Sequence, residues 1–212
     1  MSRLVSRLFK WGFILLLAGL LSIAAVFMFL SPKLPSAESL RTVQLQIPLR
    51  IFSEEGLLMA EFGEKRRIPA AYEDIPPKLI QAFLAAEDDR FFEHPGVDYQ
   101  GLIRAAYSLA MTGEKAQGGS TITMQVARNF FLSNEKTYLR KINEIILSLE
   151  IENTLSKEEI LALYLNKIFL GQRAYGVGAA AEVYYGKKLE DLTLAQMAMI
   201  AGLPKAPSTT NP

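Results

Sequence analysis

The sequence predicts a mainly α-helical domain that follows a small β-hairpin and one membrane-spanning helix. Three observations support this class: an uncharged apolar run near the N-terminus, a short pair of segments rich in β-branched and aromatic residues, and then apolar residues repeated at helical spacing. With 212 residues, the chain is long enough for one substantial globular unit and an anchor. We therefore expect one helical domain attached to a membrane.

The composition excludes several kinds of site. The formal net charge is +1 and no long block of like charge occurs, so nothing in the overall charge favours nucleic acid as a partner. The chain has no cysteine and one histidine, which excludes disulfides, thiolate catalysis and cysteine metal sites and argues against zinc. Any charged binding site must therefore be local.

The N-terminal apolar run at residues 11–30 is predicted to span a membrane. It contains no charge, and as a helix it covers roughly 30 Å, the thickness of one hydrocarbon core. Arg3, Arg7 and Lys10 precede it, so the positive-inside rule places residues 1–10 in the cytoplasm and the rest of the chain outside. A cleaved signal peptide is the alternative, but the run is longer than a usual signal core and no clear A-x-A site follows it, which favours an uncleaved anchor.

Three regions follow the anchor. Residues 31–42 carry two prolines and small polar residues, which predicts a short spacer at the membrane surface. Residues 43–52 and 57–62 are rich in β-branched and aromatic residues and are joined by a turn that contains glycine, which predicts a hairpin within residues 43–70. Residues 71–212 contain no comparable strand signal and are predicted to form successive helices.

The first helix of this domain is predicted to end in an acidic and aromatic turn. A rotation of 100° per residue places Glu87 within the apolar face of the helix. A carboxylate in that position suits general acid or base chemistry near neutral pH. The alternative is a helix that ends in a solvated acidic turn, and this stretch alone does not decide between them. The turn reads Glu87-Asp88-Asp89-Arg90-Phe91-Phe92-Glu93-His94-Pro95-Gly96.

The polar, glycine-bearing segment at residues 112–119 is predicted to be a mobile loop, and Ser120 is the expected cap of the helix that follows. In that helix Thr121, Gln125 and Arg128 lie within about 60° of one another, so they form one hydrogen-bonding face. A solvated helix surface is the alternative.

A longer helix is predicted from residue 136 to about residue 154. Arg140 and Glu144 lie four residues apart on the face opposite its apolar residues, and Lys141 lies toward the same polar side. A pair with this spacing is usually a surface ion pair worth a few tenths of a kcal/mol. By itself this helix therefore does not indicate a site.

The remaining helices carry clear boundary signals. Ser156 and Glu159 have capping-box spacing, and a helix start is also expected near Thr193. Between these starts, the small residues at 174–181 permit close helix packing. The single G-x-G in that run follows no predicted strand, so it does not indicate a dinucleotide site.

Taken together, these segments resemble the glycosyltransferase domain of the peptidoglycan polymerases, which are the class A penicillin-binding proteins and their monofunctional relatives. The resemblance covers about Leu57 to the C-terminus and implies a lysozyme-like helical glycosyltransferase domain. It rests on five blocks in the family's order: Glu87 to Gly96, Gly118-Gly119-Ser120-Thr121-Ile122-Thr123-Met124-Gln125, Arg140-Lys141-Ile142-Asn143-Glu144, Ile160 to Gly171, and Ala201-Gly202-Leu203-Pro204-Lys205-Ala206-Pro207.

The resemblance implies a role for several residues. Glu87 matches the general base, which takes the proton from the 4-hydroxyl of the acceptor lipid II as that oxygen attacks the anomeric carbon of the donor. Glu144 matches a glutamate near the donor pyrophosphate and its divalent cation, Mg or Mn, and Arg140 and Arg128 would neutralise the departing pyrophosphate. The other matched positions are Thr121, Gln125 and Lys141 at the donor site, Asp88 and Phe91, which shape the site, and His94, which we expect to be structural.

The resemblance also implies partners and a location. Lipid II, the growing lipid-linked glycan and the bilayer are the expected partners, and elongation or division proteins are further candidates; no organic cofactor is expected. The location would be the bacterial inner membrane, with the domain in the periplasm. Since class A proteins continue into a serine transpeptidase, we expect a truncated chain at Pro212, with a short polymerase as the alternative.

Two other functions remain open at this point. A lysozyme-like enzyme that cleaves glycan would share the expected helical fold and would also use carboxylates. A membrane-anchored scaffold that only binds cell-wall precursors would need no catalytic base. The chain departs from the family's usual residues at Met124, where a glutamine is usual, and at Ala162, where a glutamate is frequent.

Overall fold

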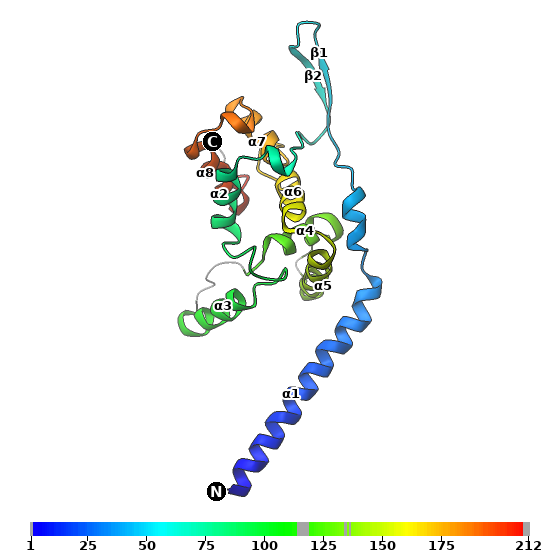
Figure 1. The fold of residues 1–212 in the computed structure, drawn as a ribbon, viewed down its shortest axis with the longest axis vertical. Helices are drawn as coiled ribbons and strands as arrows, with labels where there is room; N and C mark the ends of the chain where they lie inside the picture. The colour runs from blue at the N-terminus through cyan, green and yellow to red at the C-terminus, as the bar shows by residue number, and fades with distance from the viewer. Residues whose placement is uncertain (1, 114–118, 134, 136, 210–212) are drawn as a thin grey trace. The chain divides into compact units, whose positions relative to one another are not determined.

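The computed structural model describes residues 2–113, 119–133, 135 and 137–209, and the chain divides into two compact units, residues 1–36 and 37–212. The predicted class is confirmed, because the described residues form helices, one two-stranded antiparallel sheet and one long apolar helix at the N-terminus (Figure 1). The loop predicted to be mobile falls largely on residues 114–118, which lie outside the described residues.

The first unit consists of α1 (Ser2–Leu30) and a 3-10 turn, η1 (Ser31–Lys33). The predicted span at residues 11–30 lies within α1, and large apolar side chains are exposed along it. By length and composition, α1 is the one described helix that can cross a membrane. A helix that is apolar all round fits the interior of a bilayer better than water.

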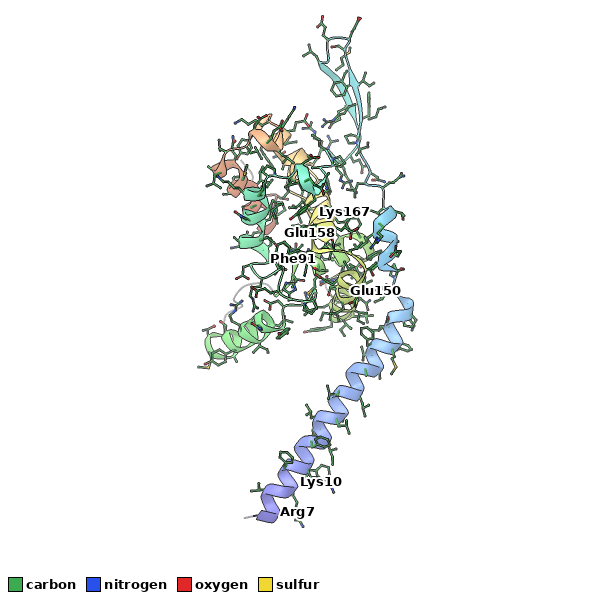
Figure 2. The ribbon with its side chains drawn as sticks, viewed as in Figure 1. Arg7, Lys10, Phe91, Glu150, Glu158 and Lys167 are labelled. Atoms are coloured by element: carbon green, nitrogen blue, oxygen red, sulfur yellow. The ribbon has the colours of Figure 1, made fainter. Side chains whose placement is uncertain are left out.

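The second unit begins with η2 (Ala37–Thr42), a short 3-10 helix in the second half of the predicted spacer. The backbone N–H of Ala37 donates to Glu150 Oε1 at 3.1 Å, and Glu150 lies on α5 (Tyr138–Thr154) (Figure 2). The Arg41 guanidinium donates to the carbonyl of Thr154 at 2.7 Å, and Leu40 is buried. This half of the spacer is therefore a packed part of the helical unit.

The predicted hairpin is confirmed. Strand β1 (Leu49–Phe52) pairs antiparallel with β2 (Leu58–Phe62), and the register shifts between Ile51 and Phe52. Arg50 lies 2.8 Å from Glu61 on the opposite strand and 2.8 Å from Glu182 on α7 (Val177–Tyr185). Since an isolated two-stranded hairpin is marginal in water, this ion pair to α7 helps to hold it on the unit.

The core of the second unit lies between helices that pack in pairs. Helix α2 (Pro77–Glu87) packs against α8 (Leu194–Gly202), and α4 (Ile122–Phe131) packs against α5 and α6 (Lys157–Lys167). In Figure 1, α3 (Tyr99–Thr112) extends away from these helices. The largest fully buried side chains include Phe83, Phe91 and Tyr164.

The helix starts predicted at Ser156 and near Thr193 are confirmed, whereas the cap predicted at Ser120 is not. Ser156 and Thr193 both form complete capping boxes. The prediction that Ser120 caps α4 is wrong, because the Thr121 hydroxyl accepts the Met124 N–H at 3.1 Å and is the cap. The Ser120 hydroxyl instead accepts from Lys141 Nζ at 2.7 Å.

The small residues at 174–181 allow the close packing that the sequence predicts. A Cβ on Gly178 would lie 2.3 Å from the carbonyl oxygen of Ile68, so only glycine allows the backbone at this point to approach so closely. Val177, Ala179, Ala180 and Ala181 are all buried. This packing sets α7 against the chain that leads into α2.

Candidate active site

The predicted acidic turn begins where α2 ends. Glu87 is the last residue of α2 and is half-buried, whereas Asp88 is buried. The Asp88 carboxylate accepts a hydrogen bond at 2.9 Å from the backbone N–H of Ile122, and Ile122 lies in the first turn of α4. The same carboxylate also lies 2.9 and 3.1 Å from His94 Nε2. A carboxylate at a helix N-terminus interacts favourably with the helix dipole, so Asp88 joins the turn to α4.

His94 lies inside the turn and contacts Asp88 and Phe91. It is buried, its Nε2 faces Asp88, and its ring meets the ring of Phe91 edge-on with centroids 6.2 Å apart. Since a carboxylate only accepts hydrogen bonds, Nε2 carries a proton in this contact. The buried Nδ1 has no partner among the described residues. The imidazole therefore braces the turn from within.

Phe91, at the centre of the turn's sequence, is fully buried. The Lys157 ammonium lies over its ring at 4.3 Å from the centroid and donates to the carbonyl of His94 at 2.8 Å. The same ammonium donates to Glu152 at 2.8 Å, and the Glu152 carboxylate accepts from the Thr123 hydroxyl at 2.5 Å. This chain of contacts joins the turn to α4, α5 and α6.

The polar face predicted on α4 lies against the same turn. Gln125 is buried, and its amide donates to Glu87 Oε2 at 2.8 Å. The Thr121 hydroxyl donates to the carbonyl of Gly96 at 2.6 Å while it caps α4, so both its donor and an acceptor site are already used. Gln125 is thus the member of this face that directly contacts the candidate base.

The predicted cluster on α5 is also formed, and its carboxylate is buried, unlike that of a surface ion pair. Glu144 is 2% exposed, with Oε1 paired to Arg140 and Oε2 3.2 Å from Lys141 Nζ. Burial, followed by the charges of Arg128 and Arg140, lowers the pKa of Lys141 from 10.5 to about 8. The cations of Arg128, Arg140 and Lys141 thus interact with one another and with a single carboxylate, that of Glu144. This leaves a local excess of positive charge.

The structure thus connects the predicted site residues in two groups. Glu87, Asp88, Phe91, His94, Thr121 and Gln125 are linked around the turn, and Arg140, Lys141 and Glu144 are linked on α5. The groups meet through α4, because Lys141 bonds to Ser120 at the start of α4 and is influenced by Arg128 near its end.

Sequence reasoning missed four residues that support these groups. Thr123, Glu152 and Lys157 form the chain of contacts behind the turn, and Tyr164 is fully buried on α6. Lys157 and Glu152 lie five residues apart across a helix boundary, so no helical periodicity relates them. Nothing in the local sequence therefore indicates this chain of contacts.

The family resemblance implies a divalent cation near Glu144. The described residues contain no group of three or more His, Asp or Glu side chains that could enclose a metal ion. Mg²⁺ usually keeps several waters and takes one or two carboxylates together with substrate phosphates. Glu144 is a single carboxylate of the kind that this pattern uses, and both its oxygens are paired with Arg140 and Lys141. The described residues do not form an all-protein cage.

Comparisons with known proteins give a consistent result. Residues 55–212 match the family model described as Transglycosylase. Penicillin-binding protein 1A of Pseudomonas aeruginosa is 60% identical over 203 residues, which cover 95% of this chain and 25% of that protein. Penicillin-binding protein 1A of Escherichia coli is 56% identical over 197 residues, 93% of this chain and 23% of that protein.

The comparison with solved structures includes a relative from the same group of proteins. The crystal structure of penicillin-binding protein 1A from Haemophilus influenzae, at 2.6 Å resolution, aligns with a TM-score of 0.40 and 37% sequence identity, over 80% of this chain and 16% of that one. The chain therefore spans about a quarter of the length of the curated relatives that it matches.

Proposed function

This chain belongs to the transglycosylase family and carries its peptidoglycan glycosyltransferase domain, and we propose that it polymerises lipid II into glycan strands at the outer face of the bacterial cytoplasmic membrane. One observation carries the proposal. The Glu87 carboxylate at the end of α2 accepts a hydrogen bond from Gln125, and Arg140 and Lys141 flank the buried Glu144 on α5 and supply excess positive charge.

Glu87 is the proposed general base. It takes the proton from the 4-hydroxyl of the acceptor sugar while that oxygen forms a bond to the anomeric carbon of the donor. The bond from that carbon to the pyrophosphate oxygen breaks, and its electron pair leaves with the pyrophosphate. The hydrogen bond from the Gln125 amide to Oε2 fixes one carboxylate oxygen, so Oε1 is available to the acceptor hydroxyl.

The cluster on α5 is proposed to stabilise the leaving group. The pyrophosphate gains negative charge as its bond to the sugar breaks, and preorganised cations at that position lower the barrier. Arg140 and Lys141 are held by Glu144, so little reorganisation is needed when the substrate arrives. Arg128 adds a third positive charge from α4. With this charge, the reaction needs no carboxylic acid to protonate the leaving oxygen.

We also propose that Glu144 contributes to binding a divalent cation, Mg or Mn, together with the donor phosphates. When bound, such a cation would add neutralising charge at the pyrophosphate. The role of the protein itself stays the same, because Glu144 holds Arg140 and Lys141 in place. The substitution Glu144→Gln removes one charge from this cluster and is expected to slow turnover.

The alternative of a glycan-cleaving enzyme is less well supported by the site. Glycoside hydrolysis generally needs two carboxyl groups that serve the same bond, one of them as an acid. Both oxygens of Glu144 are paired with cations, so neither is placed to donate a proton to a glycosidic oxygen. This environment suits a charge-stabilising role better than acid catalysis.

The anchor fits substrates that are themselves tethered by lipid. We propose that α1 spans the bilayer with the N-terminus in the cytoplasm, because Arg7 and Lys10 lie on that side of the apolar run. Helix α3 offers a second contact, since it exposes an apolar and aromatic stripe at four-residue spacing. The stripe consists of Tyr99, Ile103, Tyr107 and Met111.

The direct test is to incubate the purified chain with lipid II and a divalent cation. Formation of glycan polymer supports the proposal. Release of fragments from finished glycan, without polymerisation, would instead support the cleaving enzyme. If lipid II binds but neither product forms, the chain is a precursor-binding scaffold.

A further inference from the structure

Tyr164 on α6 packs against the helix that ends at the proposed base. Its side chain is fully buried, and its ring meets that of Phe83 edge-on, with centroids 6.1 Å apart and an interplanar angle of 82°. Phe83 lies four residues before Glu87 on α2, so both point to the same side of that helix. Tyr164 therefore lies next to the helix face that carries Glu87.

The hydroxyl of Tyr164 has no hydrogen-bond partner among the described residues. Buried polar groups in native proteins are nearly always paired, because an unpaired group loses its hydration without compensation. Phenylalanine would fill the same space and make the same contact with Phe83 without that cost. A buried hydroxyl without a partner in this position therefore needs a physical explanation.

The surrounding charges indicate what the hydroxyl can do. Burial and then the negative charge of Glu87 raise the pKa of Tyr164 well above its usual value; Asp88 adds to this effect, and Arg128 opposes it. The hydroxyl therefore keeps its proton and can donate a hydrogen bond to a carboxylate. Helix α8, which packs against α2, carries no titratable residue.

We propose that Tyr164 is a positioning residue for Glu87, with its hydroxyl donating through one ordered water to the Glu87 carboxylate while Gln125 holds Oε2. Two donors on one carboxylate fix its orientation toward the acceptor hydroxyl and favour its ionised form, which is the form that acts as a base. The inference rests on the proposed role of Glu87.

The test compares Tyr164→Phe with Tyr184→Phe in the full chain, using lipid II polymerisation, its pH profile and thermal unfolding. Tyr184 is the matched control, because its hydroxyl donates to the carbonyl of Leu170 at 2.7 Å and takes no part in the site. We expect Tyr164→Phe to unfold at the same or a higher temperature. We also expect its kcat to fall about tenfold and the acidic limb of kcat/KM to move about one unit to higher pH.

Tyr184→Phe is expected to unfold at a lower temperature with unchanged kcat and pH profile. A wild-type kcat and pH profile for Tyr164→Phe would overturn the inference, and so would a loss of activity that only follows a lower unfolding temperature. Glu87→Gln separates this inference from the proposed function. If Glu87→Gln is inactive and Tyr164→Phe is normal, only the role of Tyr164 fails, whereas an active Glu87→Gln contradicts the proposed function itself.

Discussion

Replacing Asp88 by alanine is expected to destabilise the helical unit by about 2–6 kcal/mol. Asp88 accepts from two buried donors, the backbone N–H of Ile122 at 2.9 Å and Nε2 of His94 at 2.9 Å. Each buried donor left without an acceptor costs about 1–3 kcal/mol, and two such donors give the range. Because Asp88 joins the turn to α4, the same change should also displace Glu87 from Gln125.

Asp88→Asn is the matched control for this change. Its amide oxygen still accepts from Ile122, and its NH₂ group can donate to Nε2 if the imidazole carries its proton on Nδ1 instead. Both hydrogen bonds then survive, but without the charge that roughly doubles their strength. We therefore expect Asp88→Asn to cost about 1–3 kcal/mol, less than the alanine variant.

Thermal unfolding of the full chain, followed by circular dichroism, measures both effects. For a chain of this size, 1 kcal/mol shifts Tm by about 2–4 °C, so Asp88→Ala should lower Tm on the order of 10 °C. The reasoning is refuted if Asp88→Ala melts within about 2 °C of the unmodified chain. It is also refuted if Asp88→Ala and Asp88→Asn lower Tm equally, because the loss of stability would then not depend on whether the hydrogen bonds to residue 88 survive.

Three further predictions concern other parts of the site. Because the pKa of Lys141 is lowered to about 8, its positive charge is present below that pH and lost above it. We therefore expect kcat/KM to fall as the pH rises through about 8, and the alkaline limb of the pH profile to move to higher pH in Lys141→Arg. Gly96→Ala should lower stability by about 2–4 kcal/mol in thermal unfolding, because φ is +87° and the new Cβ would lie 2.7 Å from the carbonyl of Ser148. Ile103→Glu should reduce polymerisation of lipid II in vesicles several-fold but not in detergent, and equal losses in both would exclude a membrane contact for α3.

Helical periodicity predicted much of the site, because it depends on neighbours along one helix. Helical spacing placed Thr121, Gln125 and Arg128 on one face of a helix. In the structure Gln125 contacts Glu87 and Thr121 contacts Gly96 from that helix. The same periodicity identified Arg140 and Glu144 as a pair. It could not show that Glu144 is buried, since burial depends on how α5 packs against α4.

Contacts between distant segments could not be predicted in this way. Thr123 bonds to Glu152, 29 residues later, and the Lys157 ammonium reaches back to the carbonyl of His94, 63 residues earlier. Composition also gave an incomplete description of residues 31–42. Their prolines and small polar residues are typical of a spacer, but Leu40 is buried and η2 is bonded to α5. In each case the tertiary fold, and not the local sequence, determines the contact.

The measurement that tests the central claim most directly is lipid II polymerisation by Glu87→Gln, with lipid II binding measured in parallel. Glutamine keeps the size of the side chain but cannot accept the proton of the acceptor hydroxyl. We expect the rate to fall by about 10²–10⁴-fold while lipid II binding is retained. Polymerisation at the unmodified rate would contradict the assignment of Glu87 as the base and the account of this site built on it.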